Sequence, residues 1–293
     1  MVVVSALGSA FLYALAAVFQ QRAAVAEPLE HSLRLRLLFN LLRRPLWLAG
    51  LACDVGAFVL QFYALDHGSL VLVQPLLVSG LLFALPLGAL LSHERMRRSD
   101  WIGAALVVIG LSVFLIVAQP DRGSADAAPK VWLMLVVTIL FTVSVLVFAA
   151  QHTKGSRRAG FLAAAAGTMY GLTAALTKAC GHLLDEGLKH LFTSWKPYAL
   201  TAGGISGTLI DQSAYQAGPL NWSLPIVTVT DPVVSIAIGA FVFGEGINVK
   251  GIAPIVEAIA LVVMTIGVFQ LSSSPLVASV KEEKEEEPTE EPS

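Results

Sequence analysis

Charged residues are scarce in this chain. Only 14% of its 293 residues are Asp, Glu, Lys or Arg, whereas 56% are hydrophobic; a soluble domain usually carries about 25% charge. The formal net charge of −2 hides a mildly basic body, because seven of the 21 acidic residues lie in the last twelve positions. This composition is typical of a membrane protein with cationic loops, and it gives no indication of a nucleic-acid partner.

Cysteine and the common catalytic motifs are also nearly absent. The two cysteines, Cys53 and Cys180, fall inside apolar runs and have no disulfide or metal-ligand spacing. The six histidines lie at predicted helix ends or in connections, and the sequence contains no nucleophile elbow and no glycine-rich nucleotide loop. We therefore expect neither an enzymatic activity nor a cofactor.

Long apolar runs, in contrast, fill most of the chain. A run of about 20 residues can cross a hydrocarbon layer of about 30 Å as a helix. We predict an all-α integral membrane protein with about nine spans, at residues 2–23, 46–65, 69–91, 101–118, 131–150, 161–184, 198–218, 222–243 and 251–271. The first run is long and lacks the positive start of a signal peptide, so we expect it to be retained.

The connections divide the chain into two transmembrane halves. The first half, residues 1–118, includes an interfacial amphipathic segment at 25–44, where arginines are interleaved with leucines. A polar linker at 119–130 precedes the second half, residues 131–271. Residues 272–293 end in KEEKEEEPTEEPS, which predicts a disordered acidic tail.

Positive charge is distributed unequally between the two sides of this topology. One side holds eleven Lys and Arg residues, namely Arg22, Arg34, Arg36, Arg43, Arg44, Arg95, Arg97, Arg98, Lys154, Arg157 and Arg158, and the other holds five, namely Arg122, Lys130, Lys189, Lys196 and Lys250. The positive-inside rule places the richer side in the cytoplasm. We therefore expect a protein of the plasma (inner) membrane, with the amino terminus and the 119–130 linker outside and the tail inside.

The second half contains a weak repeat of the first. A displacement of about 151 residues brings Gln61 onto Gln212 and Glu94 onto Glu245, and both pairs keep a Gln-to-Glu spacing of 33 residues. Because this displacement spans an odd number of predicted helices, the second copy would be inverted in the membrane. Inverted repeats are the construction of many secondary transporters. The alternative is that apolar helices resemble one another by composition alone.

Five ionisable residues lie within the predicted spans: Asp54, Lys178, Asp211, Asp231 and Glu257. A charge at mid-membrane costs at least about 2.5–3.5 kcal/mol, so such residues usually face a cavity or one another. Four acids and one base favour a cationic substrate or a coupling proton. The alternative is that Lys178 forms a structural pair with one acid while another acid is protonated.

Three of these acids are candidates for a shared site. Asp54, Asp211 and Asp231 fall at similar depths in their spans, so we predict that they approach one water-filled cavity near mid-membrane. With Gln61, Gln212 and Thr228 they could supply the oxygen ligands that Mg²⁺ prefers.

Two prolines in the spans are candidate hinges. Pro232 follows Thr228-Val-Thr-Asp and removes a helix hydrogen bond, and Pro75 lies in the corresponding span of the first half. The alternative is that each proline only shapes packing.

The stretch WLAGLACDVGAFVLQFYALDHGSLVLVQPL, residues 47–76, resembles the drug/metabolite transporter (EamA-like) superfamily and, within it, the NIPA-type magnesium transporters. The resemblance continues at Glu94, at Lys178 and at Gln212 with Tyr215, and the family's nine spans agree with the number predicted here. It departs at Phe58, where the family tends to carry a glutamate and this chain has Asp54 one turn earlier. It implies that Lys178, Gln212 and Tyr215 join the substrate-binding set.

Two functions of different classes follow. The first is a secondary transporter that moves a small cationic or zwitterionic solute, with Mg²⁺ as one candidate, by alternating access. The second is a non-transporting protein that binds lipid or a partner subunit and whose intramembrane charges are structural. A homo-oligomer is compatible with either function.

Overall fold

The structure, a computed structural model, describes residues 1–25, 43–92, 97–119, 121, 123–124, 126–217, 220–246 and 251–273. Every regular element in these ranges is a helix, as the sequence predicts. The elements are α1 (Val2–Val25), α3 (Pro45–His67), α4 (Leu70–Val78), α5 (Gly80–Ser92), α6 (Arg98–Ala118), α7 (Pro129–Gln151), α8 (Gly155–Asp185), α9 (Leu188–Thr193), α10 (Lys196–Ala217), α11 (Leu220–Val242) and α12 (Ala253–Ser272). Most of the interfacial segment predicted at 25–44 and nearly all of the predicted tail lie outside the described residues.

Six helices of the described chain are long and apolar enough to cross a membrane: Pro45–His67, Arg98–Ala118, Pro129–Gln151, Gly155–Asp185, Pro225–Val242 and Ala253–Ser272. Val2–Ala16 and Leu70–Ala84 are shorter apolar helical stretches, and the second of them runs across the boundary between α4 and α5. Eight of the nine predicted spans coincide with a single helix to within six residues at either end. The membrane class therefore has direct support, whereas the count of nine spans stays a prediction.

The span predicted at 69–91 is divided into two helices, α4 and α5, by a turn at Ser79. The Ser79 hydroxyl donates to the Leu76 carbonyl at 2.6 Å, which satisfies one of the carbonyls left at the end of α4. Gly80 then lies against α1, where a Cβ atom would stand 3.1 Å from the Ala10 carbonyl oxygen. Pro75 thus lies one turn before a real break, whereas α11 runs as one helix through Pro225 and Pro232.

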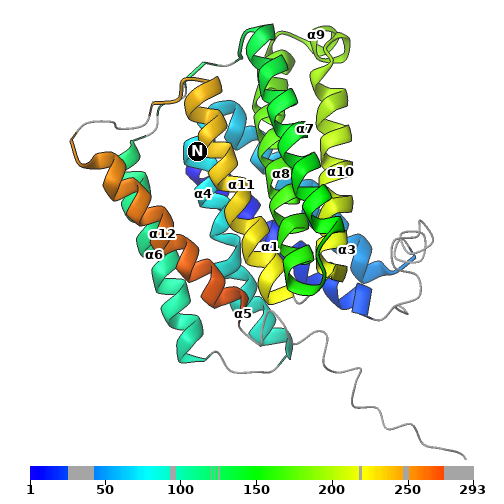
Figure 1. The fold of residues 1–293 in the computed structure, drawn as a ribbon, viewed down its shortest axis with the longest axis vertical. Coiled ribbons are helices and arrows are strands. Elements are labelled where there is room, and N and C mark those ends of the chain that lie inside the picture. Colours follow the sequence, from blue (N-terminus) through cyan, green and yellow to red (C-terminus); the bar gives the residue numbers. More distant parts are fainter. Residues whose placement is uncertain are drawn as a thin grey trace, which may run out of the picture.

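The helices pack in pairs. α1 lies along α3, α8 along both α10 and α11, α6 along α12, and α4 along α11. Figure 1 shows α7, α8 and α10 as an upright group and α6 with α12 on the opposite side of α11. Glycines allow the closest approach. A Cβ atom on Gly110 of α6 would lie 2.7 Å from the backbone of α12, and one on Gly171 of α8 would lie 2.6 Å from Val234 of α11.

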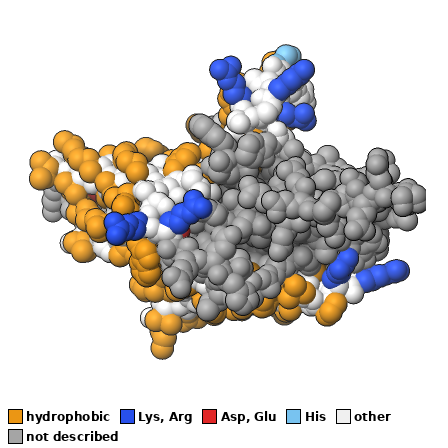
Figure 2. Space-filling view, turned by 90° about the horizontal axis from the view of Figure 1, so that it is seen from below, with side chains coloured by type: hydrophobic (Ala, Val, Ile, Leu, Met, Phe, Trp, Pro, Cys, Tyr) orange, Lys and Arg blue, Asp and Glu red, His pale blue; other side chains and the backbone are white. Residues whose placement is uncertain are grey.

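Cationic side chains gather at the end of the bundle where α6 and α8 begin. Arg97, Arg98, Lys154, Arg157 and Arg158 are all exposed there. Figure 2 looks at the molecule from below and shows Lys and Arg side chains in separate groups among hydrophobic ones. These positions are the ones that the positive-inside rule assigns to the cytoplasm, although the orientation itself stays a prediction.

The lateral faces of the bundle are apolar. α7 alone exposes Leu133, Met134, Val137, Phe141 and Phe148, each by at least 57% of its surface. A soluble monomer rarely exposes so large a continuous apolar face. This surface fits contact with lipid chains.

Candidate functional site

The first part of the site lies between α1 and α3. Asp54 and Gln61 are seven residues apart on α3, or about two helical turns, so they share one face of that helix. The Tyr13 hydroxyl of α1 donates to Oε1 of Gln61 at 2.7 Å. All three side chains are half-buried, although they sit in the middle of apolar helices.

A corresponding contact lies between α8 and α10. The Tyr170 hydroxyl of α8 donates to Oδ2 of Asp211 on α10 across 3.5 Å, a long and therefore weak hydrogen bond. The Tyr170 ring covers Gly207, where a Cβ atom would lie 2.9 Å from the ring edge. Asp211 is only 8% exposed. Glycine at this position thus allows the edge of the tyrosine ring to approach α10 closely.

Asp231 lies on α11, the helix that packs along α8. Ser235, one turn later, donates to Oδ1 of Asp231 at 3.1 Å. The helix is held close to α8 at this level, because a Cβ atom on Gly167 would lie 3.0 Å from the Asp231 backbone nitrogen. The three predicted aspartates thus lie on α3, α10 and α11, and their approach to one cavity stays a prediction.

The remaining predicted residues are placed less completely. Thr228 is half-buried on α11, three residues before Asp231 and on the same side of the helix. Gln212 and Tyr215 fall on α10, but their side chains lie outside the described part. Glu257 is 6% exposed on α12, and its Oε1 has no hydrogen-bond partner among the described residues. Within the described ranges, no three His, Cys, Asp or Glu side chains form a ready metal site.

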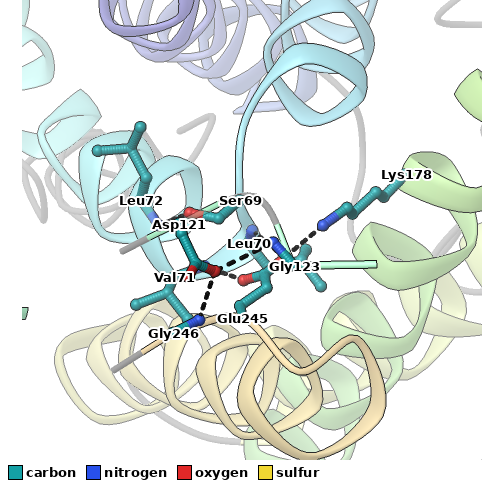
Figure 3. Close-up of polar contacts among 9 residues, drawn as sticks. All are labelled: Ser69, Leu70, Val71, Leu72, Asp121, Gly123, Lys178, Glu245 and Gly246. Atoms are coloured by element: carbon teal, nitrogen blue, oxygen red, sulfur yellow. Dashed lines mark hydrogen bonds and ion pairs between the residues drawn. The ribbon is translucent and has the colours of Figure 1, made fainter. Parts of the chain in front are cut away.

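Lys178 belongs to a different group. Its Nζ lies 2.6 Å from Oε1 of Glu245, and the two side chains are 5% and 0% exposed. Glu245 also accepts hydrogen bonds from the backbone N–H groups of Leu70 at 2.8 Å and Val71 at 2.9 Å, in the first turn of α4 (Figure 3). A carboxylate at a helix N-terminus is favoured by the helix dipole. Lys178 further stands 4.8 Å from the centre of the Phe243 ring.

The 119–130 linker is fastened to the same end of the bundle. Oδ1 of Asp121 accepts hydrogen bonds from the N–H groups of Gly246 at 2.7 Å and Gly123 at 3.1 Å (Figure 3). The Ser124 N–H donates to the Phe243 carbonyl at 2.6 Å. We call this layer the linker-side closure; it is formed by Lys178, Glu245, the first turn of α4 and the linker residues Asp121, Gly123, Ser124 and Asp126.

Asp126 anchors the outer edge of this closure. It forms an ion pair with Lys196 and accepts a hydrogen bond from Nε1 of Trp132 at 2.7 Å. Partial burial acts to raise the pKa of Asp126, but the hydrogen bonds from Lys196, Trp132 and the Ala127 N–H, together with the Lys196 charge, outweigh it and hold the pKa below its ordinary value. The carboxylate is therefore ionised whenever the closure is formed at neutral pH.

Sequence reasoning missed two features of this arrangement. Tyr13 and Tyr170 were not among the predicted site residues, although a tyrosine inside an apolar span is a usable signal, since its hydroxyl needs a partner. The partner of Lys178 was also missed, because Glu245 follows the end of its helix and was read only as the counterpart of Glu94. Glu94 itself lies outside the described residues.

Comparison of the sequence with known proteins identifies a family for this chain. Residues 32–118 match the model of the EamA-like transporter family. An uncharacterised protein of Corynebacterium glutamicum is 31% identical over 271 residues, which cover 92% of this chain and 94% of that protein. No solved structure matches the chain. The chain belongs to the EamA-like transporter family of the drug/metabolite transporter superfamily, an integral membrane family of transporters and not of enzymes.

Proposed function

We propose that this protein is a permease that carries a small cationic or zwitterionic solute across the plasma membrane by alternating access. The observation that carries the proposal is the presence of three aspartates, Asp54, Asp211 and Asp231, within apolar helices of the bundle, with Asp211 accepting a hydrogen bond from the Tyr170 hydroxyl. Carboxylates in such surroundings are stable only with protons or a cation nearby. A site that attracts one positive charge from water into the membrane is the central requirement of a cation carrier.

The pairing of helices supports an inverted repeat. In the first half α1 packs along α3 and against α4 and α5, and in the second half α8 packs along α10 and α11 in the same way. The two tyrosine contacts follow this correspondence, since Tyr13 joins α1 to α3 and Tyr170 joins α8 to α10. Across the two halves α4 pairs with α11, and α6 with α12. Two halves with matching contacts can exchange conformations, so that the site opens first to one side and then to the other, which is the physical basis of alternating access.

The linker-side closure supports a state that is shut on one side. Glu245 follows α11 in the second half, and it binds the first turn of α4 in the first half. Lys178 lies in the same half as Glu245. The halves could therefore separate at this end by losing the hydrogen bonds of Glu245 to the first turn of α4. The Lys178–Glu245 ion pair would then move as one unit, so neither charge would lose its partner.

Mg²⁺ is one cation that the proposal includes, because of the likeness to NIPA-type transporters. This ion demands oxygen ligands and usually keeps several waters, so carboxylates on separate helices can hold it through its water shell. In that case Asp54, Asp211 and Asp231 would be the ligands, with Gln61, Gln212, Tyr215 and Thr228 as further oxygen donors. The same carboxylates would pair equally well with the ammonium group of an organic cation or a zwitterion.

Uptake into proteoliposomes tests the proposal. Purified protein is reconstituted, and entry of Mg²⁺, methylammonium, tetramethylammonium and a set of amino acids is measured against protein-free vesicles. We expect saturable uptake of at least one of these solutes, with competition among solutes that share the site. Failure of every solute to enter above the protein-free rate would favour the alternative, a lipid-binding or assembly protein with structural charges.

A further inference from the structure

The linker holds the short segment that carries Glu245 on both sides of that residue. Oδ1 of Asp121 accepts a hydrogen bond from the Gly246 N–H at 2.7 Å, one residue after Glu245 (Figure 3). The Ser124 N–H donates to the Phe243 carbonyl at 2.6 Å, two residues before Glu245. These two contacts fix both ends of the segment 243–246.

Gly123 brings the linker backbone against the same segment. Its φ is +56°, a conformation that glycine adopts at no steric cost. A Cβ atom on Gly123 would lie 2.5 Å from the Phe243 carbonyl oxygen and 2.8 Å from the Glu245 backbone nitrogen. The linker can therefore pass this close to Glu245 because residue 123 has no side chain.

The other end of the linker is fastened to α7 and α10. Asp126 forms an ion pair with Lys196 and accepts a hydrogen bond from Nε1 of Trp132 at 2.7 Å. The buried Trp132 ring meets the Phe243 ring edge-on, with 6.0 Å between their centres, and Lys178 stands 4.8 Å from the centre of the Phe243 ring. All these contacts are with the second half, so the linker and the segment 243–246 can move together as part of that half.

The segment held in this way carries the carboxylate that reaches across to the first half. The Glu245 oxygens accept hydrogen bonds from the N–H groups of Leu70 at 2.8 Å and Val71 at 2.9 Å. A displacement of the segment by about 1 Å would take both distances out of the range of a hydrogen bond. A contact that keeps the segment in place therefore favours the state in which the two halves are joined at this end.

We propose that Asp121 and Gly123 are positioning residues of the linker-side closure: they hold the segment 243–246 so that the Glu245 carboxylate reaches the first turn of α4. Loosening either contact shifts the protein toward a state that is open on the linker side, because an equilibrium between two states responds to contacts that are made in only one of them. The proposal rests on the proposed function, since it names what controls one of the two openings that alternating access requires.

A buried cysteine in the first turn of α4 can report this opening. Val71 is 0% exposed, and Val71→Cys keeps the backbone N–H that donates to Glu245. The change is made in a background without Cys53 and Cys180, and the rate of reaction with an impermeant thiol reagent is measured on the purified full-length protein in micelles. Ala163→Cys, in the same background, reports general loosening of the fold, because Ala163 is also 0% exposed and lies about 22 Å before Lys178 along α8.

Asp121→Ala removes the acceptor for the Gly246 N–H. We expect it to speed labelling of Val71→Cys roughly 2- to 10-fold, which is the shift that the net contribution of one hydrogen bond supplies. Asp121→Asn keeps a carbonyl oxygen at this place and should stay within about 2-fold of the unchanged rate. Asp185→Ala is the matched control, because Asp185 is an exposed acid near the end of α8, and it should have no effect.

Gly123→Ala tests the proposal without removing a carboxylate. The added methyl group has no room beside Phe243 and Glu245, so the linker must move away and labelling of Val71→Cys should again become faster. The Ala163→Cys rate should stay unchanged in every variant. Unchanged Val71→Cys rates in both Asp121→Ala and Gly123→Ala would overturn the positioning role and leave the cation carrier standing. Equal acceleration at Val71→Cys and Ala163→Cys would overturn it too, since the linker would then only stabilise the fold.

The action through Glu245 has a test of its own. In a Glu245→Gln background, Asp121→Ala should add little further acceleration, whereas independent, multiplying effects would overturn the positioning role. The Asp121→Asn and Gly123→Ala comparisons do not depend on the folding of this variant. Absence of uptake of every solute in proteoliposomes, with the labelling results as expected, would instead overturn the proposed function.

Discussion

Removing the buried charge of Glu245 is expected to destabilise the fold strongly. In the Glu245→Gln variant Lys178 loses its ion pair with the Glu245 carboxylate, at 2.6 Å, in a region where the Lys178 side chain is only 5% exposed. Breaking a buried ion pair by removing one partner typically costs about 3–5 kcal/mol, because the other charge stays buried. The glutamine carbonyl can still accept one of the two hydrogen bonds from the first turn of α4. We therefore expect the loss in free energy of unfolding to lie toward the lower end of that range.

The Lys178→Met variant is expected to be milder. Glu245 would retain hydrogen bonds from Leu70 and Val71 and the favourable helix dipole, which is worth about 0.3–2 kcal/mol. The double variant removes both charges and preserves side-chain volume, and such replacements are often nearly neutral. We therefore expect the double variant to be more stable than Glu245→Gln alone, with a coupling energy of at least about 2 kcal/mol, within the range for residues in direct contact.

The assay is reversible unfolding in mixed micelles, followed by tryptophan fluorescence, on the four members of this double-mutant cycle. Lys189→Met serves as a control, because Lys189 is exposed on α9 and should change the free energy of unfolding by less than about 0.5 kcal/mol. The reasoning would be refuted if the two single changes were each nearly neutral and simply additive in the double variant.

Three further predictions concern packing, pH and topology. Gly110→Ala should lower the free energy of unfolding by about 1–3 kcal/mol, because the added Cβ would lie 2.7 Å from the backbone of α12. Gly204→Ala, where the added Cβ would have no atom within 4 Å, should be neutral or stabilising. Equal effects of the two changes in the unfolding assay would contradict the close glycine packing of α6 on α12. The pKa of Asp126 is held below its ordinary value of 3.8, so its stabilising contribution is present above about pH 4 and is lost as the pH falls through the folded-state pKa. Asp126→Asn should therefore lower the melting temperature at pH 7, and the difference from the unchanged protein should shrink at lower pH. A difference in melting temperature that does not depend on pH would contradict this role of Asp126. Single cysteines at Ser124 and Ser156, in a background without Cys53 and Cys180, should react with an impermeant thiol reagent from opposite faces, Ser124 from outside; labelling of both from one face would disprove the topology.

The positions of the helices could be predicted because hydrocarbon imposes a simple rule. A helix that crosses the membrane needs about 20 apolar residues, and such runs can be read directly from the sequence. The break at Ser79 could not be predicted in the same way, since the run from residue 69 to 91 is apolar throughout. At this break Gly80 lies against the Ala10 backbone of α1, and such a tertiary contact cannot be read from the sequence.

The sequence singles out the acids of the candidate site, but it does not reveal which side chains contact the polar residues of the bundle. Asp54, Asp211 and Asp231 stand out because a carboxylate in an apolar run is costly, and their depths follow from counting residues. Glu245 gave no such signal, because it lies beyond its helix and 67 residues from Lys178. A tertiary contact over that separation leaves no periodic trace in the sequence.

Charge removal at the aspartates tests the central claim most directly. Asp54→Asn and Asp231→Asn preserve shape, and each should abolish uptake in proteoliposomes of the solute that the unchanged protein carries, while the melting temperature stays close to that of the unchanged protein. Asp185→Asn, at an exposed acid near the end of α8, should transport normally. If both variants carried the solute at the unchanged rate over a range of pH, the acids would be structural and the proposed cation site would be wrong.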